Sequence, residues 1–234
     1  MATTHPALQA RSQRTASRVL SATRALLARR GLDELSVAEI AARAGVSIGG
    51  FYARFSSKEA VLVQLCDDRF FSRFLAQLET TLDPALMAGT AIPEMLDLFH
   101  ATAIAAFRAN RHVLRELARF SRTMPDATFR ERVNQFNQAV HRHLSALLLA
   151  RAREIHHPEP RLAVDLAIVA VSAVMREQVL FSALRPDVQA ISDQRLAAEL
   201  TTLCCGYLGV ARPTAPCRTR RGAVRSPRSK GASK

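Results

Sequence analysis

The chain has 234 residues, four cysteines and a formal net charge of +13. The cysteines form no C-x-x-C pair and no metal-ligand spacing, which argues against a disulfide scaffold and a metal-binding module. The apolar run over residues 162–181 contains Asp165, Arg176 and Glu177, which argues against a membrane span. With no apolar signal segment after Met1, we expect a cytoplasmic protein without metal or cofactor.

The positive charge lies at the two ends of the chain. Residues 1–57 carry 8 Lys/Arg and 3 Asp/Glu, residues 58–211 carry 17 of each, and residues 212–234 carry 8 and none. A basic head on a neutral body is typical of a protein that contacts nucleic-acid phosphates at one end. A polybasic chain could also bind an anionic membrane surface, so the choice of partner depends on the motif that follows.

A short helix is predicted over residues 37–44. Ser36 and Glu39 form an S-x-x-E capping box, which marks the start of a helix. The apolar residues after it recur at helical spacing, and Gly45 stands where a chain leaves a helix in a left-handed conformation. The small side chain of Ala41 in the middle of this stripe allows a second helix to cross closely.

A second short helix is predicted to begin after Ser47, which can cap it. Its core side carries Phe51 and Phe55, and its outward side carries Ile48, Gly49, Tyr52 and Ala53. This order of helix, glycine turn and helix is the layout of a helix-turn-helix, whose second helix enters the major groove of DNA.

The next helix is predicted to begin with a second capping box, made by Ser56 and Glu59. Its first turn carries Lys58, and a helix N-terminus beside a lysine is suited to a phosphate contact.

The N-terminal region resembles the TetR family of bacterial transcriptional repressors, over roughly residues 15–65. The segments that carry the resemblance are Val19-Leu20, Leu26-Leu27 through Gly31, Leu35-Ser36-Val37-Ala38-Glu39-Ile40-Ala41, and Gly45-Val46-Ser47 through Phe51-Tyr52, Phe55 and Ser57-Lys58-Glu59. The resemblance implies an all-α fold with a three-helix DNA-binding head and a six-helix regulatory and dimerisation domain.

The resemblance also implies which residues contact DNA. Tyr52 and Lys58 would bind phosphates, and residues 48–50 would approach bases, although Gly50 has no side chain to read one. By analogy with groove-reaching arms of other helix-turn-helix proteins, Arg14 and Arg18 are added. The predicted DNA-binding set is Arg14, Arg18, Ser36, Ser47, Ile48, Gly49, Gly50, Tyr52, Arg54 and Lys58.

After the motif every long segment favours helix, with proline-containing breaks between segments. The predicted helices cover 57–81, 91–109, 111–122, 126–156, 161–184 and 192–210, which with three in the head gives nine. We therefore expect a disordered basic arm over 1–13, a DNA-binding domain over 14–57, a ligand-binding and dimerisation domain over 58–211, and a disordered basic tail over 212–234.

The last two predicted helices favour a homodimer. The helix over 161–184 has apolar residues on all sides, so both sides require cover, and one can be supplied by a second subunit. The helix over 192–210 has an apolar stripe beside small residues that permit close approach. A two-fold four-helix bundle would bury these residues: Leu166, Val169, Ala173, Leu196, Leu200, Leu203 and Tyr207.

A pocket for a small, largely apolar effector is the remaining expectation, by resemblance to ligand-released repressors. Its walls are expected from aromatic and apolar residues of the central helices, with one histidine as an orienting group: Phe99, His100, Phe107, Phe120, Met124 and Phe136. Most of these residues could equally be ordinary core.

No enzymatic motif occurs in the sequence, so we expect no catalytic activity. Cys204 and Cys205 are interpreted as small buried side chains, with a redox sensor as the alternative. Two functions remain open. One is a ligand-responsive repressor bound to a palindromic operator, and the other is an architectural or non-specific DNA-binding protein dominated by its basic ends.

Overall fold

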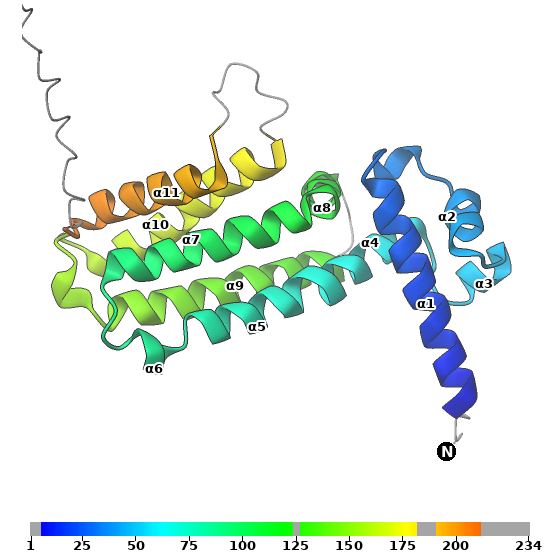
Figure 1. Cartoon of the computed structure of the whole chain (residues 1–234), viewed down its shortest axis with the longest axis horizontal. Helices are drawn as coiled ribbons and strands as arrows, with labels where there is room; N and C mark the ends of the chain where they lie inside the picture. The colour runs from blue at the N-terminus through cyan, green and yellow to red at the C-terminus, as the bar shows by residue number, and fades with distance from the viewer. Residues whose placement is uncertain (1–5, 124–126, 182–190, 212–234) are drawn as a thin grey trace, which may run out of the picture.

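The computed structural model describes residues 6–123, 127–181 and 191–211, and these residues are helical apart from turns and connecting segments. Three helices form the head: α1 (Pro6–Leu27), α2 (Val37–Ala44) and α3 (Ile48–Tyr52). The next helix, α4 (Lys58–Cys66), leads from the head into a larger body, as Figure 1 shows. The all-α class and the division into a head and a body agree with the sequence expectation.

Most helices of the body lie alongside one another, whereas the helix over residues 111–123 is seen nearly end-on (Figure 1). The helices are α5 (Ser72–Thr81), α6 (Pro84–Met87), α7 (Ile92–Ala109), α8 (Arg111–Thr123), α9 (Ala127–Leu149), α10 (Pro160–Arg176) and α11 (Asp193–Leu208). Proline at the first or second position starts α6, α7 and α10, where the missing amide hydrogen is not needed. The nine predicted segments are helical in the described residues. The segment predicted over 57–81 contains two helices, α4 and α5, and the four-residue α6 is an addition, which gives eleven.

Two single turns of π-helix interrupt the long helices, at Asp67–Phe71 between α4 and α5 and at Glu177–Phe181 after α10. The helix predicted over 126–156 ends earlier, at Leu149, and a 3-10 turn at Ala152–Glu154 follows it. A π-turn adds a residue to the helical repeat and rotates the side chains that follow it.

The first helix is longer than expected. Residues 6–13 belong to α1, so the prediction of a disordered arm over 1–13 is wrong for these residues. The N-terminal end of α1 extends beyond α2 and α3 in Figure 1, so this basic segment projects from the head. The predicted tail over 212–234 lies outside the described residues.

The body core lies between two sets of helices, with α5 beside α9 and with α7 and α10 packed on α11. The Nδ1 atom of His100 on α7 is 2.9 Å from the Thr201 hydroxyl of α11, in a buried polar contact. Arg108 and Asp193 form an ion pair of 2.9 Å between the same two helices. Over the described residues, no helix is long and apolar enough to cross a bilayer.

Candidate DNA-binding surface and ligand cavity

The predicted capping box at the start of α2 is present. The Ser36 hydroxyl accepts a hydrogen bond from the Glu39 amide at 3.1 Å, and the Glu39 carboxylate accepts one from the Ser36 amide at 2.9 Å. That amide and the Arg30 guanidinium, 2.7 Å from Glu39, lower the pKa of the Glu39 carboxyl to about 2. Glu39 therefore stays ionised at neutral pH and fixes the start of the helix.

Gly45 ends α2 in the left-handed region, with φ of 61°, as its position in the sequence predicts. The guanidinium of Arg18 on α1 donates a hydrogen bond of 2.8 Å to the Gly45 carbonyl, and a Cβ atom at Gly45 would collide with this group. Arg18, a predicted DNA contact, thus holds α1 against the turn of the motif.

The second helix of the motif, α3, has only five residues. The Ser47 hydroxyl caps it by accepting a hydrogen bond of 3.0 Å from the Gly50 amide. Phe51 and Phe55 are buried, whereas Ile48 is 51% exposed and Tyr52 54% exposed. The predicted inward and outward sides of this helix are therefore confirmed.

The predicted capping box at the start of α4 is wrong by one residue. Ser57, not Ser56, is the N-cap, and its hydroxyl accepts a hydrogen bond of 3.2 Å from the Ala60 amide. Lys58 is also placed differently from the expected phosphate contact. Its ammonium donates to the carbonyls of Leu32 at 2.9 Å, Asp33 at 3.3 Å and Leu35 at 3.0 Å. These contacts use the three N–H groups of the lysine, so it stabilises the loop between α1 and α2.

Most of the predicted DNA-binding set lies on the surface of the head. Gly50 and Lys58 are half-buried, and the remaining eight residues are exposed. These eight are Arg14, Arg18, Ser36, Ser47, Ile48, Gly49, Tyr52 and Arg54. The outward side of α3 carries little charge, so arginines around it supply the positive charge that a phosphate backbone attracts.

Leu32 joins the head to the body through its own peptide groups. Its amide donates a hydrogen bond of 3.0 Å to the carboxylate of Glu116 on α8, and its carbonyl accepts from Lys58 on α4. Arg115 and Arg119 lie 3.7 Å and 3.6 Å from the other oxygen of Glu116. Glu116 is buried, and the contact was not foreseen because its partners are 84 residues apart in sequence.

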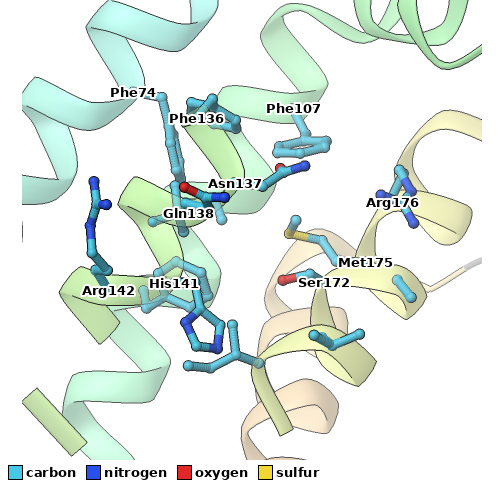
Figure 2. A pocket seen from close by; sticks show the side chains of 16 residues that line it. Phe74, Phe107, Phe136, Asn137, Gln138, His141, Arg142, Ser172, Met175 and Arg176 are labelled. Atoms are coloured by element: carbon cyan, nitrogen blue, oxygen red, sulfur yellow. The ribbon is translucent and has the colours of Figure 1, made fainter. Parts of the chain in front are cut away.

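Two adjoining cavities lie in the body next to α8, α9 and α10. The first chamber, of about 560 Å³, lies between α9 and α10, as Figure 2 shows. The second chamber, of about 640 Å³, lies toward α8. Five residues border both chambers: Phe107, Phe136, Asn137, Ala173 and Arg176. Each chamber has mostly apolar walls and a volume within the usual range of small-molecule sites.

The wall near α5 is aromatic. The Phe136 ring of α9 lies 4.6 Å from that of Phe71, 5.4 Å from Phe70 and 5.9 Å from Phe74, between ring centroids. The π-turn at Asp67–Phe71 places Phe70 and Phe71 in this cluster. A regular helical repeat over residues 57–81, without a π-turn, did not predict this aromatic cluster.

The predicted ligand residues separate into two groups. Phe99 lines the first chamber, and Phe107 and Phe136 line both. His100 lines neither, since it contacts Thr201, so its predicted role as an orienting group is wrong for these cavities. Phe120 packs near Phe129 with ring centroids 6.3 Å apart and also lines neither chamber. Met124 lies outside the described residues.

The outward sides of α10 and α11 expose apolar side chains. Leu166 is 50% exposed, Val169 59% and Leu203 58%, and Tyr207 and Ala173 are also exposed. Leu196 and Leu200, which were predicted to join this surface, are buried inside the subunit. We name the exposed part, Leu162, Leu166, Val169, Ala173, Leu203 and Tyr207, the apolar face.

The thiols in the described part of the chain are buried. Burial, together with the neighbouring Cys205, raises the pKa of the Cys204 thiol to about 12, and burial raises that of Cys66 further. A protonated, buried thiol is a poor nucleophile, which favours the structural interpretation over a redox sensor. Within the described ranges, no three His, Cys, Asp or Glu side chains are grouped to hold a metal ion.

Two family models match the chain. One, described as bacterial regulatory proteins of the tetR family, matches residues 19–65, and the other, described as a tetracycline repressor-like C-terminal domain, matches residues 91–208. An uncharacterized HTH-type transcriptional regulator of Haemophilus influenzae is 41% identical over 68 residues. That match covers 29% of this chain and 36% of the relative, so it spans about a third of the relative's length.

Solved structures with the same fold extend over most of the chain. A regulatory protein of the tetR family from Rhodococcus RHA1 superposes with a TM-score of 0.68 at 18% identity, covering 85% of this chain and 98% of that one. The regulator FadR of Bacillus subtilis, in complex with stearoyl-CoA, superposes with a TM-score of 0.59 at 19% identity, covering 80% and 96%. At these identities the likeness establishes the fold alone.

Proposed function

Because the chain belongs to the tetR family of bacterial regulatory proteins, we propose that it is a dimeric repressor that a small, largely apolar effector releases from a palindromic operator. It is a DNA-binding transcriptional regulator, and the proposal adds the form of the operator, the direction of regulation and the class of effector.

The exposed side of α3 is the observation that carries the DNA-binding part of the proposal. The helix is held from behind by buried Phe51 and Phe55, and it presents Ile48, Gly49 and Tyr52 outward. A helix so presented fits the major groove, with the exposed head residues placed for phosphates.

The apolar face supports the dimer. Large exposed apolar patches mark interaction sites, and two copies that pair α10 and α11 would bury Leu166, Val169 and Leu203 from both. A two-fold dimer places two α3 helices on one DNA, about one helical turn or a small multiple apart, so the operator is a palindrome.

The chambers support control by a ligand. α8 lines the second chamber with Leu114, Leu117 and Ala118, and its Glu116 holds Leu32 of the head. A ligand that fits only one position of α8 biases the position of the head, and so the spacing of the two heads in a dimer.

Selection of bound sequences from random DNA with the full-length protein at physiological salt tests this function. We expect enrichment of one palindrome, and we expect Tyr52→Ala to weaken its binding by at least tenfold. Leu86→Ala, which alters an exposed apolar residue of α6 in the body, is the matched control and leaves binding unchanged.

An architectural or coating protein gives the opposite result. It enriches no sequence, and its affinity falls for all DNA alike as salt rises. That outcome, or full-strength selective binding by the Tyr52→Ala variant, rules out sequence-specific DNA binding through α3.

A further inference from the structure

The first chamber has a charge pattern that restricts its ligand, whereas the second chamber also carries the carboxylate of Glu177. Among the described residues lining the first chamber there are two arginines, Arg142 and Arg176, and no carboxylate. His141 also lines it and is already paired with Asp165, with 3.1 Å between the ring Nε2 and the carboxylate. The charge available to a ligand in this chamber is therefore positive.

Arg176 is the cation placed to meet a ligand. It lines both chambers and is exposed to solvent. Within the described chain it has no ion-pair partner. Figure 2 shows that Arg176 lies on the α10 side with Ser172 and Met175, and that the Asn137 amide reaches toward them from α9. The guanidinium, amide and hydroxyl that line this chamber are donors that a carboxylate accepts.

Arg142 differs from Arg176 in placement. In Figure 2 its side chain extends away from Met175 and Ser172. It also borders a separate groove with Glu79 on the other side of α9. Of the two arginines, Arg176 is therefore the one that lies with Ser172 and Met175 on α10.

The interior beyond Arg176 is apolar. Phe99, Ala103, Ile168 and Met175 are buried residues that line the first chamber, and Phe74 and Phe136 extend its aromatic wall. An apolar body of a ligand would gain from transfer out of water in this space, and a charged group would lose unless it stayed at the opening.

From these placements we infer that the effector is an amphipathic organic acid, whose apolar body fills the first chamber and whose acidic group pairs with Arg176. The inference rests on the proposed role of the cavity and specifies its ligand class. A neutral apolar molecule would make no use of Arg176, and an organic cation would be repelled by it.

A displacement assay with the full-length protein tests the inference. The neutral dye N-phenyl-1-naphthylamine reports occupation of the apolar cavity by fluorescence, and the chain has no tryptophan to interfere. Decanoate, decanol and decyltrimethylammonium, which share one chain length, are titrated as competitors.

We expect decanoate to displace the dye at a concentration about tenfold lower than decanol, because a charge-assisted hydrogen bond contributes on that scale. Decyltrimethylammonium should be the weakest. Arg176→Gln should remove the advantage of decanoate and leave decanol unchanged. Arg161→Gln, which alters an exposed arginine of α10 that lines neither chamber, should change neither. Added salt should weaken decanoate alone.

Three results overturn the inference: equal displacement by decanoate and decanol, equal weakening of both by Arg176→Gln, or no binding of the dye to the folded protein. A different result would contradict the proposed function without contradicting the ligand class. If decanoate binds through Arg176 but does not release operator DNA, the ligand class stands and its role as effector does not.

Discussion

Gly49 and Gly50 stand next to each other in α3, and each carries the cost of a glycine in a helix, about 1 kcal/mol relative to alanine. Their surroundings differ. A Cβ at Gly49 would meet no atom within 4 Å, whereas one at Gly50 would lie 3.2 Å from the Ser47 hydroxyl that caps the helix.

We expect Gly49→Ala to stabilise the head by about 0.5–1 kcal/mol, and we expect Gly50→Ala to gain less or to destabilise, because it crowds the cap. Urea unfolding and amide exchange over residues 47–53 measure the difference. A Gly50→Ala variant that is as stable as Gly49→Ala would show that the Ser47 contact does not constrain this position.

Local chemistry made the residue-scale predictions for α2 and α3 accurate, whereas the predicted cap of α4 was wrong by one residue. Caps and left-handed glycines act over four or five residues, so Ser36, Glu39, Gly45 and Ser47 could be assigned from sequence. Lys58 could not, because its three acceptors lie more than twenty residues away, in a loop whose path depends on the fold.

At the scale of elements, α8 is the link between cavity and head. The Glu116 carboxylate accepts from the Leu32 amide while Leu114 and Leu117 of the same helix line the second chamber. Loss of the acceptor leaves a buried amide without its partner, which costs about 1–3 kcal/mol.

We expect Glu116→Ala to speed amide exchange at Leu32 by at least tenfold and to weaken operator binding, since the head is held less firmly. Glu116→Gln keeps an oxygen acceptor and should preserve most of the protection. Amide exchange followed by NMR or mass spectrometry gives the first quantity and fluorescence anisotropy the second. If Glu116→Ala and Glu116→Gln changed amide exchange at Leu32 and operator binding equally, the hydrogen bond would not be the cause of the change.

Helix ends were predictable where proline or glycine marks them, but turns of π-helix were not. Both π-turns border the second chamber, through Phe70 and Phe71 on one side and Leu180 and Phe181 on the other. A one-residue shift in the repeat leaves no composition signal, so the aromatic wall appears only in the folded chain.

At the scale of the whole molecule, we expect the apolar face to hold two subunits together. Leu203→Glu should convert the dimer to a monomer, as measured by light scattering after gel filtration. Leu203 is 58% exposed in the subunit, so the substitution itself should change the stability of the single folded subunit little.

Leu98→Glu is the control, since Leu98 is 42% exposed on α7 and lies outside the apolar face. It should leave the molecular mass of the assembly unchanged. A Leu203→Glu protein with the mass of the wild type would place the subunit contact elsewhere.

The dimer surface predicted from sequence included both buried and exposed residues of α11. Leu196, Leu200, Leu203 and Tyr207 fall on one helical stripe, yet the first two are buried and the last two are exposed. The buried side changes along the helix, toward Thr201, Cys204 and Leu208 in its second half. Periodicity assumes that one side faces the core throughout, so it could not separate them.

The Leu32 contact has a further consequence for how such proteins can be recombined. Glu116 accepts a hydrogen bond from the Leu32 amide, and Lys58 donates one to the Leu32 carbonyl. Both are main-chain groups that every non-proline residue provides. These two hydrogen bonds therefore need no particular side chain, whereas the buried side chain of Leu32 calls for an apolar residue at this position. We expect a foreign DNA-binding head joined ahead of residue 58, with a loop of the same path and an apolar residue at position 32, to form the same two hydrogen bonds and so to come under the proposed ligand control.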